Sequence, residues 1–392
     1  MNQGKYLKVR TSYSNFNFHI ISLVIIIIAI LSKIVRYAVL PDRFFIDQYR
    51  ILDLMHNPMP FTLQNSNSNL ISAFFSNTIN IFGLTSLLQW SVVFALMFNV
   101  IFIIILSKFK ITRIFDYFWV FASVVLLNTF VFVLGKDVYQ FTLFLFIYSI
   151  IKSNLSYNKK ILLCLCILLC WGLIFRVYFI LITAYMLAAC LVVAYLKKTK
   201  VKNAAIYLFF LAFVVFISLL FIMLYAPDEY NVIVGMRNRL NYRREDTLDA
   251  ATMINDLVSN NSNNIFLYMI NYIINLIRMM IPIELLTISG RIYFRGFYLI
   301  FFIYQIMITT AFIKTVKRVF QNKSSEFQSI ALVIYTGFLL GSGLFEPDFG
   351  SWVRHQATIW PILMFLFFDY KKAENASIEQ STCTSKYLHT RT

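Results

Sequence analysis

The chain contains repeated apolar segments that are long enough, or nearly long enough, to cross a lipid bilayer. A helix needs about 20 mostly apolar residues for one crossing. Inside lipid a backbone must satisfy its own hydrogen bonds, and helices are the only open structures that do so. The composition agrees, with 59% hydrophobic and 14% charged residues among 392. We therefore predict an all-α, polytopic integral membrane protein with ten spans, several of them short: 19–40, 86–107, 115–134, 138–151, 161–175, 177–196, 203–225, 292–313, 329–345 and 356–368.

The charges indicate how these spans are oriented. Lysine and arginine outnumber aspartate and glutamate by 35 to 18, and loops that face the cytoplasm carry the excess of basic residues. With a cytoplasmic N-terminus, most basic residues fall on the cytoplasmic side. They lie in the N-terminal segment, in the segments 108–113, 152–160, 197–202 and 314–323, and after residue 370. The net charge of +17 thus reflects membrane topology, and we expect no nucleic-acid partner.

Residues 1–370 are predicted to form a single transmembrane domain. The two long outer loops, 41–85 and 226–264, are too short to fold around cores of their own. The polar segment 371–392 is predicted to be a disordered cytoplasmic tail. The first span has no A-x-A-like cleavage site, so we interpret it as a retained signal anchor. Near its outer end we expect Lys33 and Arg36 to reach out to the membrane interface.

The segment 264–288 does not fit a simple span. A crossing there would place Arg291 and Arg295 inside and the basic residues of 314–323 outside, against the charge rule. Its polar residues follow each other at steps of 4, 3, 4 and 3, which places them on one helical face: Asn264, Tyr268, Asn271, Asn275 and Arg278. We predict a re-entrant or interfacial helix whose polar face lines a cavity; the alternative is a tilted eleventh span.

Two carboxylates follow the first span at the outer membrane rim. Arg43, Asp47 and Arg50 share one helical face, which predicts an amphipathic helix on the outer surface. Asp42 or Asp47 could there take a proton from an acceptor hydroxyl group. The alternative is a plain intrahelical ion pair. The spacing does not choose between the two aspartates.

Cations recur in the other outer turns. Lys136 lies in the turn 135–137, Arg176 lies in the very short turn 175–178, and Arg354 and His355 end the charged, aromatic segment 345–355. Arg278 and Arg291 add to this set. Guanidinium groups match phosphate oxygens in bidentate geometry. We therefore predict a phosphate- or sugar-binding site; the alternatives are a solvated turn for Lys136 and an interfacial side chain for Arg176.

Several sources of chemical activity have no sequence signature here. The chain contains no Walker loop, no H-E-x-x-H helix and no G-x-S-x-G elbow. The spacing of its five cysteines gives no C-x-x-C pattern. We therefore predict neither a cofactor nor a metal site.

The outer segments resemble those of the bacterial Wzy-type O-antigen and capsular polysaccharide polymerases, in particular the EpsG-like group. The resemblance rests on the acidic segment 42–53, on the turns 135–137 and 175–178, and on the segment 346–355. The group shows a Ser-Lys-Glu-like hairpin and an Arg-Pro-Tyr-like turn. Here Gly135 and Asp137 replace the outer members of the first motif, and Val177 replaces the proline of the second.

The resemblance implies a GT-C-like enzyme in the bacterial inner membrane. It would move a growing glycan from undecaprenyl pyrophosphate onto the sugar of another lipid-linked repeat unit, with a chain-length regulator as a further candidate partner. Asp42 or Asp47 would then be the base, and Arg176, Arg278 and Arg354 would hold the pyrophosphate. Lys136 and His355 would assist. Two alternatives stay open: another polyprenyl-linked-sugar glycosyltransferase or O-antigen ligase, and a lipid-linked oligosaccharide flippase or transporter.

Overall fold

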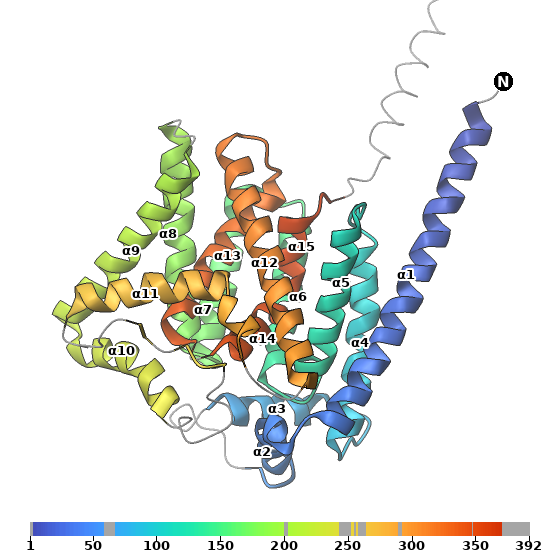
Figure 1. Ribbon diagram of the computed structural model, residues 1–392, viewed down its shortest axis with the longest axis horizontal. Coiled ribbons are helices and arrows are strands. Elements are labelled where there is room, and N and C mark those ends of the chain that lie inside the picture. The colour runs from blue at the N-terminus through green and yellow to red at the C-terminus, as the bar shows by residue number, and fades with distance from the viewer. Residues whose placement is uncertain are drawn as a thin grey trace, which may run out of the picture.

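A computed structural model shows a helical bundle (Figure 1). It describes residues 3–58, 67–199, 203–242, 252–254, 256–257, 264–288, 292–346 and 348–370. All regular secondary structure in these residues is helical, and they contain no strand. The predicted all-α class is therefore confirmed.

Within the described residues, eight helices are long and apolar enough to cross a membrane. They are α1 (Gln3–Val39), α4 (Leu87–Leu106), α5 (Ile114–Leu126) with its π-helical extension η2 (Leu127–Val131), α7 (Tyr157–Ile174), α8 (Tyr178–Lys198), α9 (Ala204–Tyr225), α12 (Ile292–Phe320) and α13 (Glu326–Phe345). This number of apolar helices is that of a multi-pass membrane protein.

The other two predicted spans are shorter elements inside the bundle. They are α6 (Lys136–Lys152) and the broken pair α14 (Phe349–Thr358) and α15 (Trp360–Phe367). Pro361, in the first turn of α15, accounts for the break, because proline starts a helix but cannot continue one. The prediction of ten to eleven spans thus corresponds to eight helices of spanning length and two shorter elements that neighbouring helices enclose.

Helix α13 forms the centre of the bundle. Residues 328–344 are all buried, and α13 packs most extensively against α8. Gly337 and Gly341 allow this contact, since an added Cβ at Gly337 would lie only 2.7 Å from the carbonyl oxygen of Ile182. Small residues let transmembrane helices approach each other in this way.

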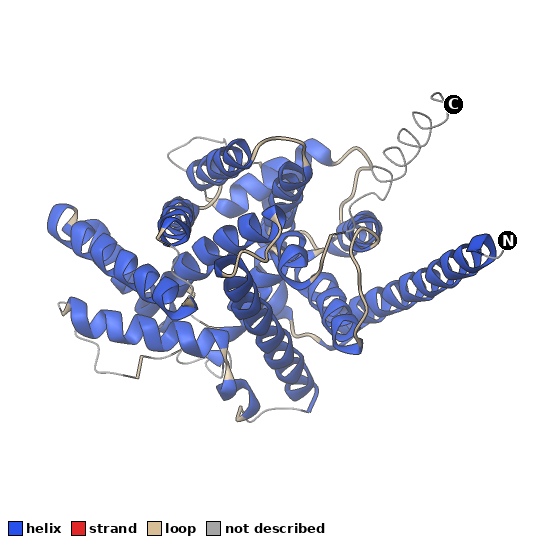
Figure 2. Ribbon diagram, turned by 90° about the horizontal axis from the view of Figure 1, so that it is seen from above, coloured by secondary structure: helices blue, strands red, loops and turns tan. Residues whose placement is uncertain are grey.

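The predicted basic loops gather at one end of the bundle, which we call the basic end (upper end in Figure 1). The backbone N–H of Lys110 donates to the carbonyl oxygen of Asp369, and the Asp369 side chain lies 3.7 Å from the guanidinium of Arg318. Lys160 pairs with Glu326 at 2.7 Å. The N-terminal end of α1 projects from the same end (Figures 1 and 2).

Helices that do not cross the bundle occupy the half opposite the basic end. We call this end of the bundle, the lower end in Figure 1, the network end. These helices are η1 (Asp42–Phe45), α2 (Ile46–His56), α3 (Ser68–Ile79), α10 (Pro227–Tyr242), α11 (Ile265–Met280) and η4 (Ile283–Leu286). Helix α11 runs across the bundle in Figure 1, with only 16 residues before the Ile281–Pro282 break. Its Asn271 and Asn275 are buried. This arrangement agrees with the predicted interfacial helix rather than with an eleventh span.

Candidate functional site

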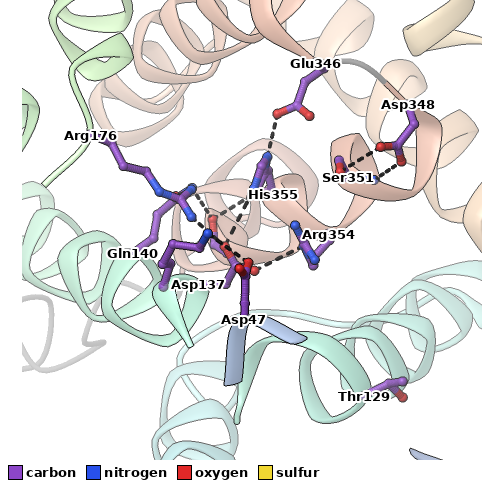
Figure 3. A network of polar contacts seen from close by, with 12 residues as sticks. Asp47, Thr129, Asp137, Gln140, Arg176, Glu346, Asp348, Ser351, Arg354 and His355 are labelled. Atoms are coloured by element: carbon purple, nitrogen blue, oxygen red, sulfur yellow. Dashed lines mark hydrogen bonds and ion pairs between the residues drawn. The ribbon is translucent and has the colours of Figure 1, made fainter. Parts of the chain in front are cut away.

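A buried carboxylate, Asp137, lies at the centre of a polar network at the network end (Figure 3). Its Oδ1 lies 3.2 Å from Nη2 of Arg176 and 3.6 Å from Nε2 of His355. Its Oδ2 lies 3.1 Å from Nε of Arg354. One carboxylate is thus shared by side chains from the α7–α8 turn and from α14.

The sequence positions Asp137 through the start of α6. Gly135 directly precedes the helix and has an extended backbone. The helix begins at Lys136, so Asp137 lies in its first turn. The partial positive charge of a helix N-terminus favours a carboxylate there. Helix α2 approaches the same turn closely, since an added Cβ at Gly135 would lie 3.8 Å from the side chain of Gln48.

Arg176 turns inward instead of reaching the membrane interface. Its Nη1 donates to Gln140 Oε1 at 2.8 Å and to the Tyr178 hydroxyl at 2.7 Å, and its side chain is 9% exposed. The turn between α7 and α8 is so short that the side chain leaves directly into the bundle. Gln140, one helical turn after Asp137, was missed by the sequence analysis although its position on the Asp137 face of α6 could have indicated it.

His355 is held by a second buried carboxylate. Its Nδ1 lies 2.5 Å from Oε1 of Glu346, the C-cap residue directly after α13. With Nδ1 bonded to Glu346, Nε2 faces Asp137 and the centre of the network. Histidine changes its charge near neutral pH, so a ring oriented in this way can accept or donate a proton.

Asp348 fixes the start of α14, the helix that carries Arg354 and His355. Its Oδ1 accepts a hydrogen bond from the Ser351 backbone N–H at 2.7 Å, which is an N-cap. Burial acts to lower the pKa of Arg354, but Asp137, Asp348 and Asp47 together outweigh it, so the pKa is raised and the guanidinium stays charged.

Of the two predicted carboxylates after the first span, Asp47 belongs to the network and Asp42 does not contact it. Asp47 pairs with Lys136 at 2.8 Å. Burial acts to raise the pKa of Asp47, but Lys136 and Arg354 together offset it and the pKa is lowered. A lowered pKa makes a carboxylate a weaker proton acceptor. Asp42 instead lines a separate cavity of about 370 Å³, together with Tyr37 and Phe45.

The predicted cation Arg278 lies in another polar group. It pairs with Glu284 and donates to Asn275 Oδ1 at 2.9 Å, and Asn275 in turn donates to Asp256 at 2.7 Å. Arg291 lies outside the described residues. The structure therefore brings together five of the predicted site residues: Asp47, Lys136, Arg176, Arg354 and His355.

The expectation that Lys33 and Arg36 reach out to the membrane interface is wrong. Lys33 Nζ donates to Ser91 Oγ at 2.8 Å and to the Phe132 carbonyl oxygen at 2.5 Å. Arg36 donates to the Thr129 carbonyl oxygen and is only 1% exposed. The end of a helix leaves carbonyl groups without partners, and the π-helical end of α5 presents such groups to α1.

Chemically, the network offers guanidinium groups for anionic oxygens and a carboxylate-bound histidine for proton transfer. No group of three or more metal-ligating side chains occurs in the part of the chain that the structure describes.

Comparison of the chain with known protein families, with curated proteins and with solved structures found no match.

Proposed function

We propose that the chain is a membrane glycosyltransferase, an oligosaccharide repeat-unit polymerase that acts on undecaprenyl-pyrophosphate-linked glycans at the outer face of the bacterial inner membrane. One observation carries this proposal. Arg176 and Arg354, which come from distant segments, meet at Asp137 beside Lys136 and His355. This combination of cations and a proton-transfer group is what a displacement of pyrophosphate by a hydroxyl group requires.

In the proposed reaction the glycan leaves its pyrophosphate carrier. The bond from the sugar carbon to the pyrophosphate oxygen breaks, a bond from the acceptor oxygen to that carbon forms, and the hydroxyl proton passes to a base. Arg176 and Arg354 stabilise the negative charge that develops on the leaving pyrophosphate. Before the substrate binds, the ion pairs with Asp137 keep these guanidinium groups in place. The pyrophosphate anion then competes with Asp137 for them.

His355 is a better base in this proposal than the predicted Asp42 or Asp47. Asp47 is engaged with Lys136 and has a lowered pKa, and Asp42 lies at a separate cavity. The hydrogen bond that Nδ1–H of His355 donates to Glu346 orients the ring, as a third group does in catalytic triads. Lys136 then assists by neutralising Asp47 beside the leaving group.

The proposal is tested by surface-polysaccharide gels from a deletion strain that carries Arg176→Ala or Arg354→Ala. We expect the long polymer ladder to fall by about 100-fold or more while a single repeat unit is retained, since a lost oxyanion donor costs that much. Arg318→Ala is the matched control, because Arg318 forms an exposed ion pair at the basic end.

Full-length ladders from both variants would overturn the phosphate assignment. Loss of all capped lipid in the deletion strain, with not even one repeat unit, would instead indicate a flippase, a ligase or an earlier transferase. The gel therefore separates the two enzymes, because loss of a polymerase leaves one repeat unit on the lipid and loss of a ligase leaves none.

A further inference from the structure

Helix α1 carries two cations at its network end that have no acidic partner among the described residues. Arg36 is almost completely buried and Lys33 is partly buried. Within the described residues, no carboxylate forms an ion pair with either side chain. A buried charge without a counter-ion is unfavourable, and ionisable groups inside membrane helices are usually retained for a function.

The protein contacts of Arg36 leave one edge of its guanidinium unused. Nη1 donates to the Thr129 carbonyl oxygen, and the plane of the group lies over the Phe45 ring with its carbon 4.6 Å from the ring centroid. Nε and Nη2 are buried and make no hydrogen bond of good geometry within the described residues, although the Tyr37 hydroxyl lies close enough to the guanidinium to interact with it. These two nitrogens form the side-on edge of a guanidinium, which binds two oxygens of a phosphate or carboxylate at once.

This edge lies on the α1 side of the polar network. The π-helical segment η2 contacts both α1 and α14, the helices that carry Arg36 and Arg354. The two arginines are close enough for their like charges to repel each other. Tyr37 and Phe45, which contact the guanidinium of Arg36, also line the cavity that holds Asp42.

We propose that Lys33 and Arg36 form a second phosphate-binding subsite, adjoining the network, for a phosphoryl group of the lipid carrier. The identification of the carrier as a polyprenyl pyrophosphate rests on the function proposed above. The phosphate chemistry itself rests on the unused guanidinium edge, the neighbouring ammonium group and their position near the headgroup end of α1. In this arrangement Arg36 and Lys33 hold one phosphate while Arg176 and Arg354 hold the other.

The test measures binding rather than polymer formation. The purified full-length chain is studied in neutral detergent with inorganic pyrophosphate by calorimetry. It is also studied in phosphatidylcholine nanodiscs with and without undecaprenyl phosphate, by thermal unfolding. Arg36→Gln removes the charge and the side-on edge but keeps an N–H donor for the Thr129 carbonyl oxygen. Arg318→Gln at the basic end is the matched control.

We expect Arg36→Gln to weaken the binding of pyrophosphate, of undecaprenyl phosphate or of both by about tenfold, since it removes a charge-assisted bidentate contact. Arg318→Gln should bind like the native chain. An effect only in nanodiscs assigns the subsite to a lipid headgroup, and an effect in detergent extends it to free pyrophosphate. Unchanged affinity in both arms would overturn the proposal.

Lys33→Gln provides a second variant if Arg36→Gln does not fold, and it should weaken binding in the same arms. The two proposals fail separately. A chain that binds phosphate through Arg36 but makes full polymer without Arg176 and Arg354 contradicts only the proposed function. A chain that needs Arg176 and Arg354 for polymer but binds phosphate normally without Arg36 contradicts only the subsite.

Discussion

The two ends of the bundle use similar charged side chains in different ways. At the basic end, Asp369 and Arg318 form a single ion pair whose side chains are 73% and 50% exposed. At the network end, Asp137 is 8% exposed and meets two arginines and a histidine. Exposed pairs are screened by water and contribute little, whereas a buried group depends on every partner it has.

This difference shows that the charge count of a membrane protein combines two separate requirements. In membrane proteins generally, basic loops influence orientation through their charge, so their exact partners matter little. The charges of the network are held in fixed geometry by helix starts and short turns, such as the N-cap of α14 at Asp348. Three substitutions test the comparison, beginning with the largest expected effect.

Asp137→Asn should have the largest effect on stability. It removes the charge that Arg176 and Arg354 share and leaves the buried guanidinium of Arg176 without a counter-ion, which typically costs about 3 to 5 kcal/mol, while the partly exposed Arg354 adds little. Thermal unfolding of the purified chain in detergent measures the change. Asp369→Asn at the basic end is the control, with an expected cost below about 1 kcal/mol. Equal costs for both variants would remove the distinction between the two ends.

Glu326→Gln should have an intermediate effect. Lys160, its partner at 2.7 Å, is 4% exposed although it belongs to the basic end. If burial decides the cost rather than the end of the bundle, unfolding should become easier by about 1 to 2 kcal/mol, because the buried ammonium group keeps a neutral acceptor in place of a charged one. A cost as small as that of Asp369→Asn would contradict this explanation.

Lys136→Met should have the smallest effect, and the effect should depend on pH. The folded-state pKa of Asp47 is lowered, so its pairing stabilises the chain above the unfolded-state pKa of about 3.9 and is lost as the pH falls through the folded-state pKa. At neutral pH the free energy of unfolding of the native chain should therefore exceed that of the variant by at most about 1 kcal/mol. Unfolding curves at several pH values should show this difference disappear in acid. A difference that stays constant with pH would mean that Asp47 does not cause it.

The apolar runs predicted the spans well because lipid imposes a length and a composition that can be read along one segment. The exceptions are α6 and α15, which have the composition of spans but are enclosed by other helices and so need not have spanning length. The polar face of α11 was also predictable, since its spacing of 3 and 4 residues is local.

The pairing within the site could not be predicted in the same way. Asp137 meets Arg354 across more than half of the chain, and nothing in either segment specifies the other. Lys33 and Arg36 were misjudged because their direction depends on the carbonyl groups of η2, a π-helical end that the sequence does not reveal. Which of Asp42 and Asp47 lies beside Lys136 also depends on tertiary packing, and their neighbouring sequences do not specify it.

The position of Arg354 and His355 near the end of the chain has a consequence for biosynthesis. Asp137 and Arg176 enter the membrane early, in the hairpins formed by α6, α7 and α8, while the side chains that complete the network arrive only with α14. Until then the carboxylate holds its first arginine alone. The network therefore closes only after the hairpin of α13 and α14 has been inserted, so a nascent protein completes the network at that step.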